Sequence, residues 1–168
     1  MSLLSLQVFF YLQGSESNHL VGKGNSSTTP RDHYTVTQWI TNNKAGSISF
    51  HESQGKIQVK ISGYYYVYGQ MNNDNDNDNV RRAGHTTYMR NKMVMRSWAS
   101  KGRTTYHAGV FHIEKNDTLL VKIPIKRTTI MLDQKASYFG AFLLQAITTP
   151  LMIRTGIKER NLILPLRN

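Results

Sequence analysis

The stretch Gly63-Tyr-Tyr-Tyr-Val-Tyr-Gly-Gln70 places five consecutive aromatic or β-branched residues between two glycines. Such residues are enriched in strands, so the stretch predicts a β-strand. Side chains on a strand alternate between its faces, so three of the tyrosines share one face while Tyr65 and Val67 take the other. Monomers seldom expose several adjacent aromatic side chains, so both faces need cover, one from an opposing sheet and one from a neighbouring subunit.

Further strands are expected on both sides of this stretch. Apolar residues alternate with polar ones over residues 57–61 and again over 119–125. Thr104 to Ile113 and Tyr138 to Leu144 are rich in β-forming residues, and Asn116-Asp117 provides a hairpin turn. No stretch longer than ten residues shows helical periodicity. Many short strands separated by turns predict an all-β sandwich or barrel.

The length and composition allow one domain of ordinary size. A chain of 168 residues can bury about two thirds of its unfolded surface. The chain has no cysteine, which excludes disulfides, cysteine-ligated zinc, iron–sulfur clusters and thiol catalysis. This absence does not decide the compartment, because a domain of this size can be stable outside the cell without a disulfide.

The net charge of +11 is concentrated in parts of the chain. Residues 80–113 contain seven basic and no acidic residues, and Lys122, Lys126 and Arg127 form a second group. Such a distribution favours an acidic partner such as nucleic acid, a sulfated glycan, an anionic membrane or an acidic receptor face, or else a solvated strand surface. RNA-binding and helix-turn-helix signatures are absent, so we expect no nucleic-acid partner.

No arrangement of residues indicates catalysis or metal binding. His107 and His112 are five residues apart, so on a strand they point to opposite faces, and His112 with Glu114 supplies too few ligands. The polar run of residues 72–79 lacks the glycine and distal glutamate of an EF-hand loop. No nucleophile triad, phosphate-binding loop or paired carboxylate motif stands out. We therefore predict a protein that is not an enzyme and holds no metal or cofactor.

Three segments, in this order and spacing, resemble the tumour necrosis factor family. The first is Gly63–Gln70, which matches the G-x-Y-x-[VI]-Y-x-Q strand of that family. The second is Tyr106–Leu119, which is similar to its [AG]-G-V-F-x-L-x-K-G-D-x-L hairpin, and the third is Tyr138–Leu144, which matches Y-F-G-x-x-x-L. Weaker similarities at His19–Gly22 and Trp39 extend the resemblance over about residues 19–145.

The resemblance implies a jelly-roll β-sandwich of ten strands in two antiparallel sheets, assembled as a threefold trimer. It places the trimer interface on five aromatic residues, and Phe139, Val110 and Val67 in the sandwich core. The alternative is that all these side chains fill a monomer core, although tyrosine is a poor filler unless its hydroxyl finds a partner. The predicted interface residues are Tyr66, Tyr68, Tyr106, Tyr138 and Phe142.

In that family the function is receptor binding, with receptors lying in the grooves between subunits. The resemblance therefore implies a cytokine that clusters receptors of the tumour necrosis factor receptor family and triggers immune, apoptotic or developmental signalling. The groove would be lined by residues 72–79, residues 124–135 and the Asn91-Lys92 turn with its flanks. The residues expected to contact the receptor are Arg90, Asn91, Lys92, Lys126 and Arg127. Heparan sulfate or another acidic glycan is a further expected partner.

The resemblance also implies an extracellular chain, secreted or shed from a type II membrane precursor. Two sequons, at Asn25 and Asn116, fit that location as glycosylation sites. The apolar residues 2–12 are too few to span a bilayer, and they suit a clipped signal-anchor, a weak signal sequence or an extra strand. We divide the chain into an N-terminal apolar segment (1–18), the domain (19–145) and a tail (146–168).

The short turn at Asn91-Lys92 resembles the ectodysplasin and B-cell-activating-factor branch of the family. Relatives in that branch join two strands by a disulfide, whereas the corresponding positions here hold Arg96 and Thr105. The globular head of complement-type collagenous proteins shares the fold and the trimer, and implies instead a module that binds glycans or other acidic ligands. Its collagen stalk is absent from this sequence.

Overall fold

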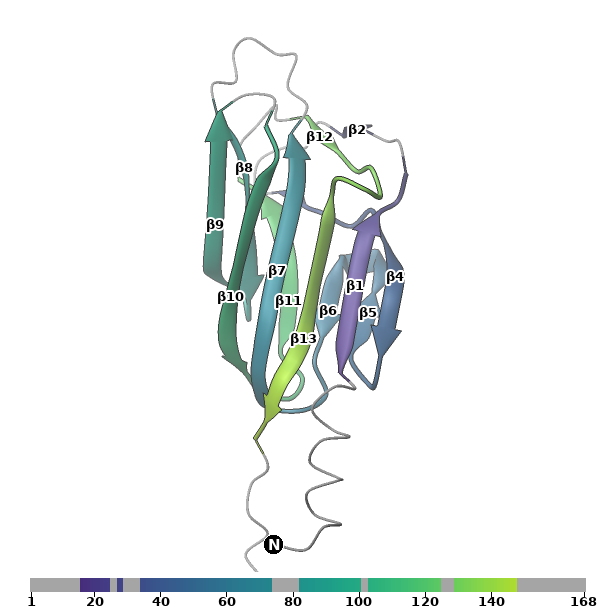
Figure 1. Cartoon of the computed structure of the whole chain (residues 1–168), viewed down its shortest axis with the longest axis vertical. Helices are drawn as coiled ribbons and strands as arrows, with labels where there is room; N and C mark the ends of the chain where they lie inside the picture. Colours follow the sequence, from purple (N-terminus) through teal and green to yellow (C-terminus); the bar gives the residue numbers. More distant parts are fainter. Residues whose placement is uncertain are drawn as a thin grey trace, which may run out of the picture.

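The protein folds as two antiparallel β-sheets packed face to face (Figure 1). The computed structural model describes residues 16–24, 27–28, 34–73, 82–100, 103–124 and 129–147. Within these ranges the only helical piece is a short 3-10 turn, η1 (Glu52–Gln54). None of the described residues forms a helix long and apolar enough to cross a membrane. The predicted all-β sandwich is confirmed.

The first sheet has the strand order β4-β1-β13-β7-β10, with β12 and β2 continuing it beside the C-terminal end of β7. Every pairing in it is antiparallel. The bounds are β1 (Ser17–Gly22), β2 (Ser27–Thr28), β4 (Trp39–Ala45), β7 (Gly63–Asn73), β10 (Thr105–Ile113), β12 (Ile130–Met131) and β13 (Tyr138–Ala146).

The second sheet has the order β5-β6-β11-β8-β9, and β3 also pairs with β11. Its members are β3 (Tyr34–Thr35), β5 (Ser49–His51), β6 (Lys56–Gln58), β8 (Arg82–Met89), β9 (Lys92–Ser100) and β11 (Thr118–Ile123). Of the thirteen strands in the described residues, β2, β3 and β12 have only two residues each. The other ten (13 − 3) agree with the ten-stranded jelly roll that the resemblance implied.

The central strand β7 alternates as the sequence predicted. Tyr65 and Val67 are fully buried between the sheets, while Tyr64 on the opposite face is 44 % exposed. A buried tyrosine hydroxyl needs a partner, and that of Tyr65 donates a hydrogen bond to the Ile61 carbonyl oxygen (2.8 Å). This bond explains how a tyrosine can occupy a core position.

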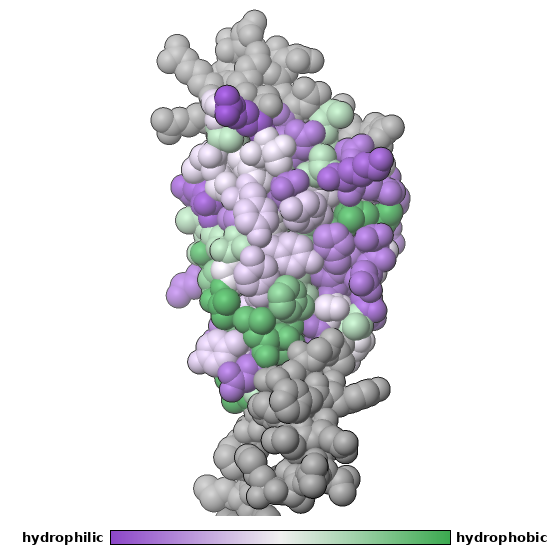
Figure 2. Space-filling model, viewed as in Figure 1, coloured by the Kyte–Doolittle hydropathy of each residue, from purple (hydrophilic) through white to green (hydrophobic). Residues whose placement is uncertain are grey.

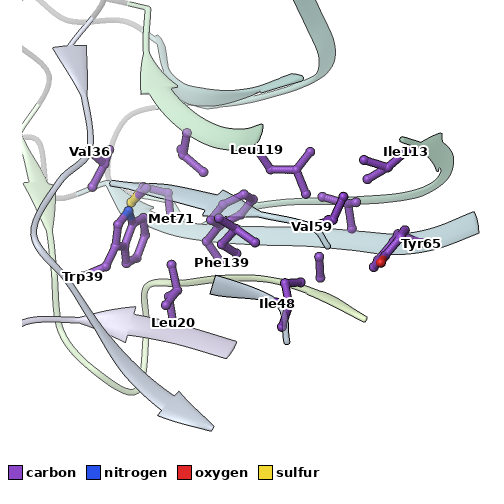
Figure 3. Close-up of a cluster of buried hydrophobic side chains, with 14 of the residues drawn as sticks. Leu20, Val36, Trp39, Ile48, Val59, Tyr65, Met71, Ile113, Leu119 and Phe139 are labelled. Atoms are coloured by element: carbon purple, nitrogen blue, oxygen red, sulfur yellow. The ribbon is translucent and has the colours of Figure 1, made fainter. Parts of the chain in front are cut away.

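The core fills the space between the two sheets (Figure 3). Trp39, at the start of β4, packs against Phe139 of β13 with 6.3 Å between ring centroids. Ile113 of β10 and Leu119 of β11 are also completely buried. Because β10 and β11 lie in different sheets, Asn116-Asp117 forms a turn between the sheets and not the hairpin turn that the sequence predicted. Burial of apolar side chains contributes about 1.5–3 kcal/mol each, so this cluster is the main source of the domain's stability.

The predicted strands 104–113 and 138–144 correspond to β10 and β13. The alternating run 57–61 is only partly a strand, because β6 ends at Gln58. Val59 remains buried, but its backbone bonds to the β10–β11 turn, donating to the Asp117 carbonyl and accepting from Asn116 N–H. Likewise, the segment 124–135, predicted as a loop, contains the two-residue strand β12.

Both ends of the described chain lie at the same end of the sandwich. The Glu16 carbonyl accepts a hydrogen bond from Leu143 N–H, and Ile147 N–H donates to the Ser62 carbonyl. The buried carboxylate of Glu16 accepts bonds from the backbone N–H groups of Ser47 and Ile48. The first strand of the domain, β1, therefore begins at Ser17, and the last strand, β13, ends at Ala146. The predictions for the rest of the N-terminal segment and of the tail fall outside the described residues.

Candidate functional site

Strand register brings the predicted interface residues onto one surface, the outer face of the first sheet. Tyr68 lies opposite Gly140, and Tyr66 lies opposite Phe142. Gln70 of β7 lies opposite Tyr106 of β10 on one side and opposite Tyr138 of β13 on the other. Directly opposed residues point to the same side of a sheet. We call this surface the aromatic face: Tyr66, Tyr68, Tyr106, Tyr138, Phe142 and the residues they contact.

The rings of the aromatic face form a continuous cluster. Tyr66 lies 5.2 Å from Phe142 and 5.9 Å from Tyr68, measured between ring centroids. Tyr68 in turn lies 6.2 Å from Tyr138. A Cβ atom on Gly140 would come within 2.4 Å of the Tyr68 hydroxyl, so the glycine gives the Tyr68 side chain room to lie over β13. Packing of the Tyr68 ring therefore requires a glycine at this position of the Y-F-G motif.

Hydroxyl groups of the face are bonded within the protomer. The Tyr66 and Tyr106 hydroxyls are 3.2 Å apart, and the Tyr138 hydroxyl donates to Gln70 Oε1 at 3.0 Å. The hydrogen bond with Tyr66, followed by burial, raises the pKa of Tyr106 to about 12. Burial raises the pKa of Tyr68 as well, with smaller contributions from Tyr138 and Tyr66. The face is thus uncharged at neutral pH and suited to an apolar contact.

His19 belongs to this face although the sequence analysis did not assign it there. Its Nδ1 atom lies 2.7 Å from the Tyr68 hydroxyl, and its ring stacks on Tyr68 with 5.8 Å between centroids. The Tyr138 ring lies 5.7 Å away on another side. Burial lowers the pKa of His19, which keeps it neutral beside the tyrosines. Its position in β1, opposite Gly140 of β13, is the signal that places it here.

The face is unusually apolar for an exposed surface. Large exposed side chains on or beside it are Tyr64, Tyr106, Val110, Phe142, Leu144 and Ile147, each between 39 % and 54 % exposed. Figure 2 shows side chains of intermediate hydropathy over the middle of this side and apolar ones toward the end where β13 finishes. Exposed apolar patches of this kind mark interaction sites.

Val110 corrects one prediction. The sequence analysis placed Val110 in the sandwich core with Phe139 and Val67, both of which are fully buried. Val110 instead lies opposite Tyr66 in the β10–β7 ladder and is 54 % exposed. Its neighbour Phe111 points inward and packs against the core. Val110 therefore adds apolar area to the aromatic face.

A buried histidine pair lies behind β7, between the sheets. The rings of His85 and His107 are 4.1 Å apart, and His85 is completely buried. His85 Nε2 donates to the Gly69 carbonyl (3.2 Å), so its Nδ1 accepts from the Thr105 hydroxyl at 2.8 Å. Desolvation lowers the pKa of His85 to about 3 and that of His107 to about 4. Both rings are neutral at pH 7.

The two positions where branch relatives carry a disulfide do not face each other. Thr105 is buried in the His85 cluster, whereas Arg96 is exposed on β9. The hydrogen bond between His85 and Thr105 joins β8 of one sheet to β10 of the other. As predicted, His107 and His112 point to opposite faces of β10.

The turn predicted to contact a receptor connects β8 to β9. Arg90 and Asn91 both have positive φ (49° and 65°), as a two-residue hairpin turn requires. Arg90 forms ion pairs with Asp117 and, at 2.5 Å, with Glu114, so it fastens this turn to the β10–β11 turn. Asn91 and Lys92 are exposed. Lys126 and Arg127 lie outside the described residues.

The described residues contain no group of three or more His, Asp or Glu side chains placed to hold a metal ion. Of the two sequons, Asn25 is outside the described residues, while Asn116 is exposed in the β10–β11 turn with φ of 73°. These features direct attention to surface recognition by the aromatic face and the β8–β9 turn.

The match to a known family decides the identity. A sequence model of the TNF (Tumour Necrosis Factor) family matches residues 37–144. The chain belongs to the tumour necrosis factor family. Ligands of this family are cytokines and not enzymes, and the chain shares the jelly-roll β-sandwich of the family. The family resemblance inferred from the three motif segments is therefore confirmed.

Individual relatives agree with this assignment. Human tumor necrosis factor ligand superfamily member 13B is 27 % identical over 137 residues, which are 73 % of this chain. The chain spans about half (47 %) of that relative's length. Member 13B is the B-cell activating factor, which fits the branch suggested by the sequence.

Solved structures share the fold at low sequence identity. The TNF protein Eiger from S. frugiperda superposes with a TM-score of 0.70 at 13 % identity, covering 82 % of this chain and 97 % of that one. The structure of murine APRIL at pH 8.0 superposes with a TM-score of 0.60 at 22 % identity, and the match covers 74 % of this chain and 95 % of that one. The structure of rabbit GITRL superposes with a TM-score of 0.53 at 14 % identity, and the match covers 80 % of this chain and 96 % of that one.

Proposed function

We propose that the chain forms a homotrimer through its aromatic face. The observation that carries the proposal is the surface exposure of Tyr106, Val110 and Phe142 on a sheet whose other side is fully packed. The tyrosine hydroxyls are already bonded to one another, to Gln70 or to His19, so a neighbouring subunit can bury the rings without leaving these hydroxyls unpaired. His19 adds a neutral, stacked ring to the same contact.

We further propose that the trimer binds and clusters cell-surface receptors of the tumour necrosis factor receptor family, and so triggers signalling. The exposed Asn91 and Lys92 are the receptor contacts that the geometry favours. Arg90 supports them mainly by shaping the turn, because its guanidinium is engaged by Asp117 and Glu114. A trimer presents three identical sites, so avidity raises the affinity above that of a single site.

The proposed location is extracellular, with the chain secreted or shed from a type II membrane precursor. The exposed sequon at Asn116 supports this location and is a proposed glycosylation site. We propose residues 19–145 as the receptor-binding unit. The family match favours the cytokine over a complement-type recognition module, which was the alternative from sequence.

A binding screen against receptor ectodomains tests this function, with Tyr68→Asp and Tyr68→Phe as a matched pair. Tyr68→Asp places three charges in the proposed interface and should dissociate the trimer, whereas Tyr68→Phe keeps the ring. We expect one receptor ectodomain to bind the wild-type chain and Tyr68→Phe tightly, and Tyr68→Asp at least about tenfold more weakly through lost avidity. A trimeric wild-type chain that binds no ectodomain of the receptor family would refute the receptor part of the proposal.

A further inference from the structure

The outer face of the second sheet carries a different kind of surface, on the opposite side of the sandwich from the aromatic face. Register places Trp98 of β9 opposite Gly84 of β8, and Met93 opposite Tyr88. Thr86, next along β8, faces both Arg96 on β9 and Lys122 on β11. We call this surface the basic platform: Tyr88, Met93, Arg96, Trp98 and Lys122.

The indole of Trp98 lies across the neighbouring strand. A Cβ atom built on Gly84 would come 2.8 Å from Cε3 of Trp98, so only a glycine lets the ring approach the β8 backbone this closely. Trp98 is nevertheless 41 % exposed, and Met93 is 45 % exposed. A monomer gains nothing from leaving these large side chains in water, so they offer apolar area to a partner.

The cations of the platform are held by aromatic rings. The Arg96 guanidinium carbon lies 5.5 Å from the Trp98 ring centroid, and Lys122 Nζ lies 4.6 Å from that of Tyr88. Strands β3, β8, β9 and β11 contain no aspartate or glutamate. Arg90 differs, because two carboxylates neutralise it. The charge of Arg96 and Lys122 therefore remains available to an anionic ligand.

We propose that the basic platform binds an acidic polysaccharide carrying sulfate or carboxylate groups. Exposed aromatic rings accept the apolar face of a sugar ring, while a guanidinium forms paired hydrogen bonds with a sulfate or carboxylate. The platform offers both groups side by side on an open sheet, where an extended chain can lie. The site goes beyond receptor binding, and only its multivalency rests on the proposed trimer, in which three platforms could engage one long polymer.

Heparin binding by the full chain tests the site, measured as Kd by surface plasmon resonance in 0.15 M NaCl, about physiological ionic strength. The double variant Arg96→Ala/Lys122→Ala should bind heparin at least about tenfold more weakly. Trp98→Ala, which changes no charge, should bind heparin about fivefold more weakly. The control Lys44→Ala removes one exposed charge from β4 in the other sheet and should change the Kd by less than about twofold.

Three results would overturn the proposal. Heparin affinity that is unchanged in both platform variants would place the binding in another segment. Equal competition by a polyglutamate peptide at matched charge would indicate an acidic protein segment as the ligand. If the platform variants lose receptor binding but still bind heparin as the wild type does, the platform is a receptor contact and not a polysaccharide site. Arg96→Gln, which keeps the aliphatic Cβ, Cγ and Cδ atoms but removes the charge, replaces Arg96→Ala if circular dichroism shows misfolding. A failed receptor screen leaves the heparin result unaffected, so the two proposals are tested separately.

Discussion

The two faces of strand β7 use the same type of residue for different purposes. On the inner face Tyr65 is completely buried, and its hydroxyl is bonded to the backbone of the same protomer. On the outer face Tyr66 and Tyr68 are only partly covered, and their hydroxyls bond to side chains of that face, Tyr106 and His19. The difference shows that folding and assembly draw on opposite sides of one strand, so changes on each side should have separable effects.

The largest expected effect comes from comparing Phe139→Ala with Phe142→Ala on strand β13. Phe139 is completely buried against Trp39, so its loss should lower the free energy of unfolding by about 3–5 kcal/mol. Phe142 is 39 % exposed on the aromatic face, so its loss should leave the fold intact and weaken assembly. Urea unfolding and light scattering across a dilution series measure the two effects. If Phe142→Ala unfolds the protein as readily as Phe139→Ala, the two faces are not separable.

Acid should act next most strongly, on the inner face, through His85 and His107. Because their folded pKa values are lowered to about 3 and about 4, only the unfolded chain gains these protons as pH falls below 6.5. The stability that the neutral histidines contribute is therefore complete above pH 6.5 and is lost as pH falls toward 4. For His85 alone the slope is about 1.4 kcal/mol per pH unit.

Urea midpoints between pH 7 and pH 4 check this expectation with His85→Gln, and with His51→Gln as a control at an exposed residue of β5. His85→Gln should start less stable at pH 7, because it disturbs the bonds to Gly69 and Thr105, but should lose less stability on acidification. His51→Gln should follow the wild type. Parallel pH curves for wild type and His85→Gln would show that the pair does not carry the acid response.

The smallest effect is expected from Tyr66→Phe on the outer face. The change removes one hydroxyl and its 3.2 Å contact with Tyr106 but keeps the ring against Phe142. A net contribution of about 0.5–1.5 kcal/mol is usual for such a bond, and the exposure of Tyr106 places this one at the low end. Sedimentation equilibrium should show a slightly weaker trimer. Complete dissociation would mean that the hydroxyl pair, rather than the ring area, holds the subunits together.

Local sequence pattern was sufficient for much of the fold. The alternation in Gly63–Gln70 predicted which tyrosines share a face, and the family resemblance predicted that Tyr66 and Tyr68 lie on the outer one. The resemblance misplaced Val110 in the core, although Val110 lies four residues after Tyr106 and therefore shares its face on a strand. The pairing of Val110 with Tyr66 in the β10–β7 ladder shows this outward position.

The basic platform could not be predicted from the sequence, because a β-bulge between β8 and β9 changes which side chains of β9 face outward. Counting back from the β8–β9 turn, where Met89 faces Lys92, would place Trp98 opposite Ala83 on the inner side. A register shift between Thr87 and Tyr88 instead brings Trp98 opposite Gly84 on the outer side. A slip of one residue reverses the face of every following side chain. The ion pairs of Arg90 were equally inaccessible, because Asp117 and Glu114 approach it only through tertiary contacts.

The solution mass of the 168-residue chain, measured by multi-angle light scattering, tests the central claim most directly. Assembly through the aromatic face predicts three times the protomer mass of 19.2 kDa, which is 57.6 kDa (3 × 19.2). The Tyr68→Asp chain should give 19.2 kDa while keeping the circular dichroism of a β-protein. A wild-type chain that remains a monomer, or a trimer that survives Tyr68→Asp, would contradict the claim.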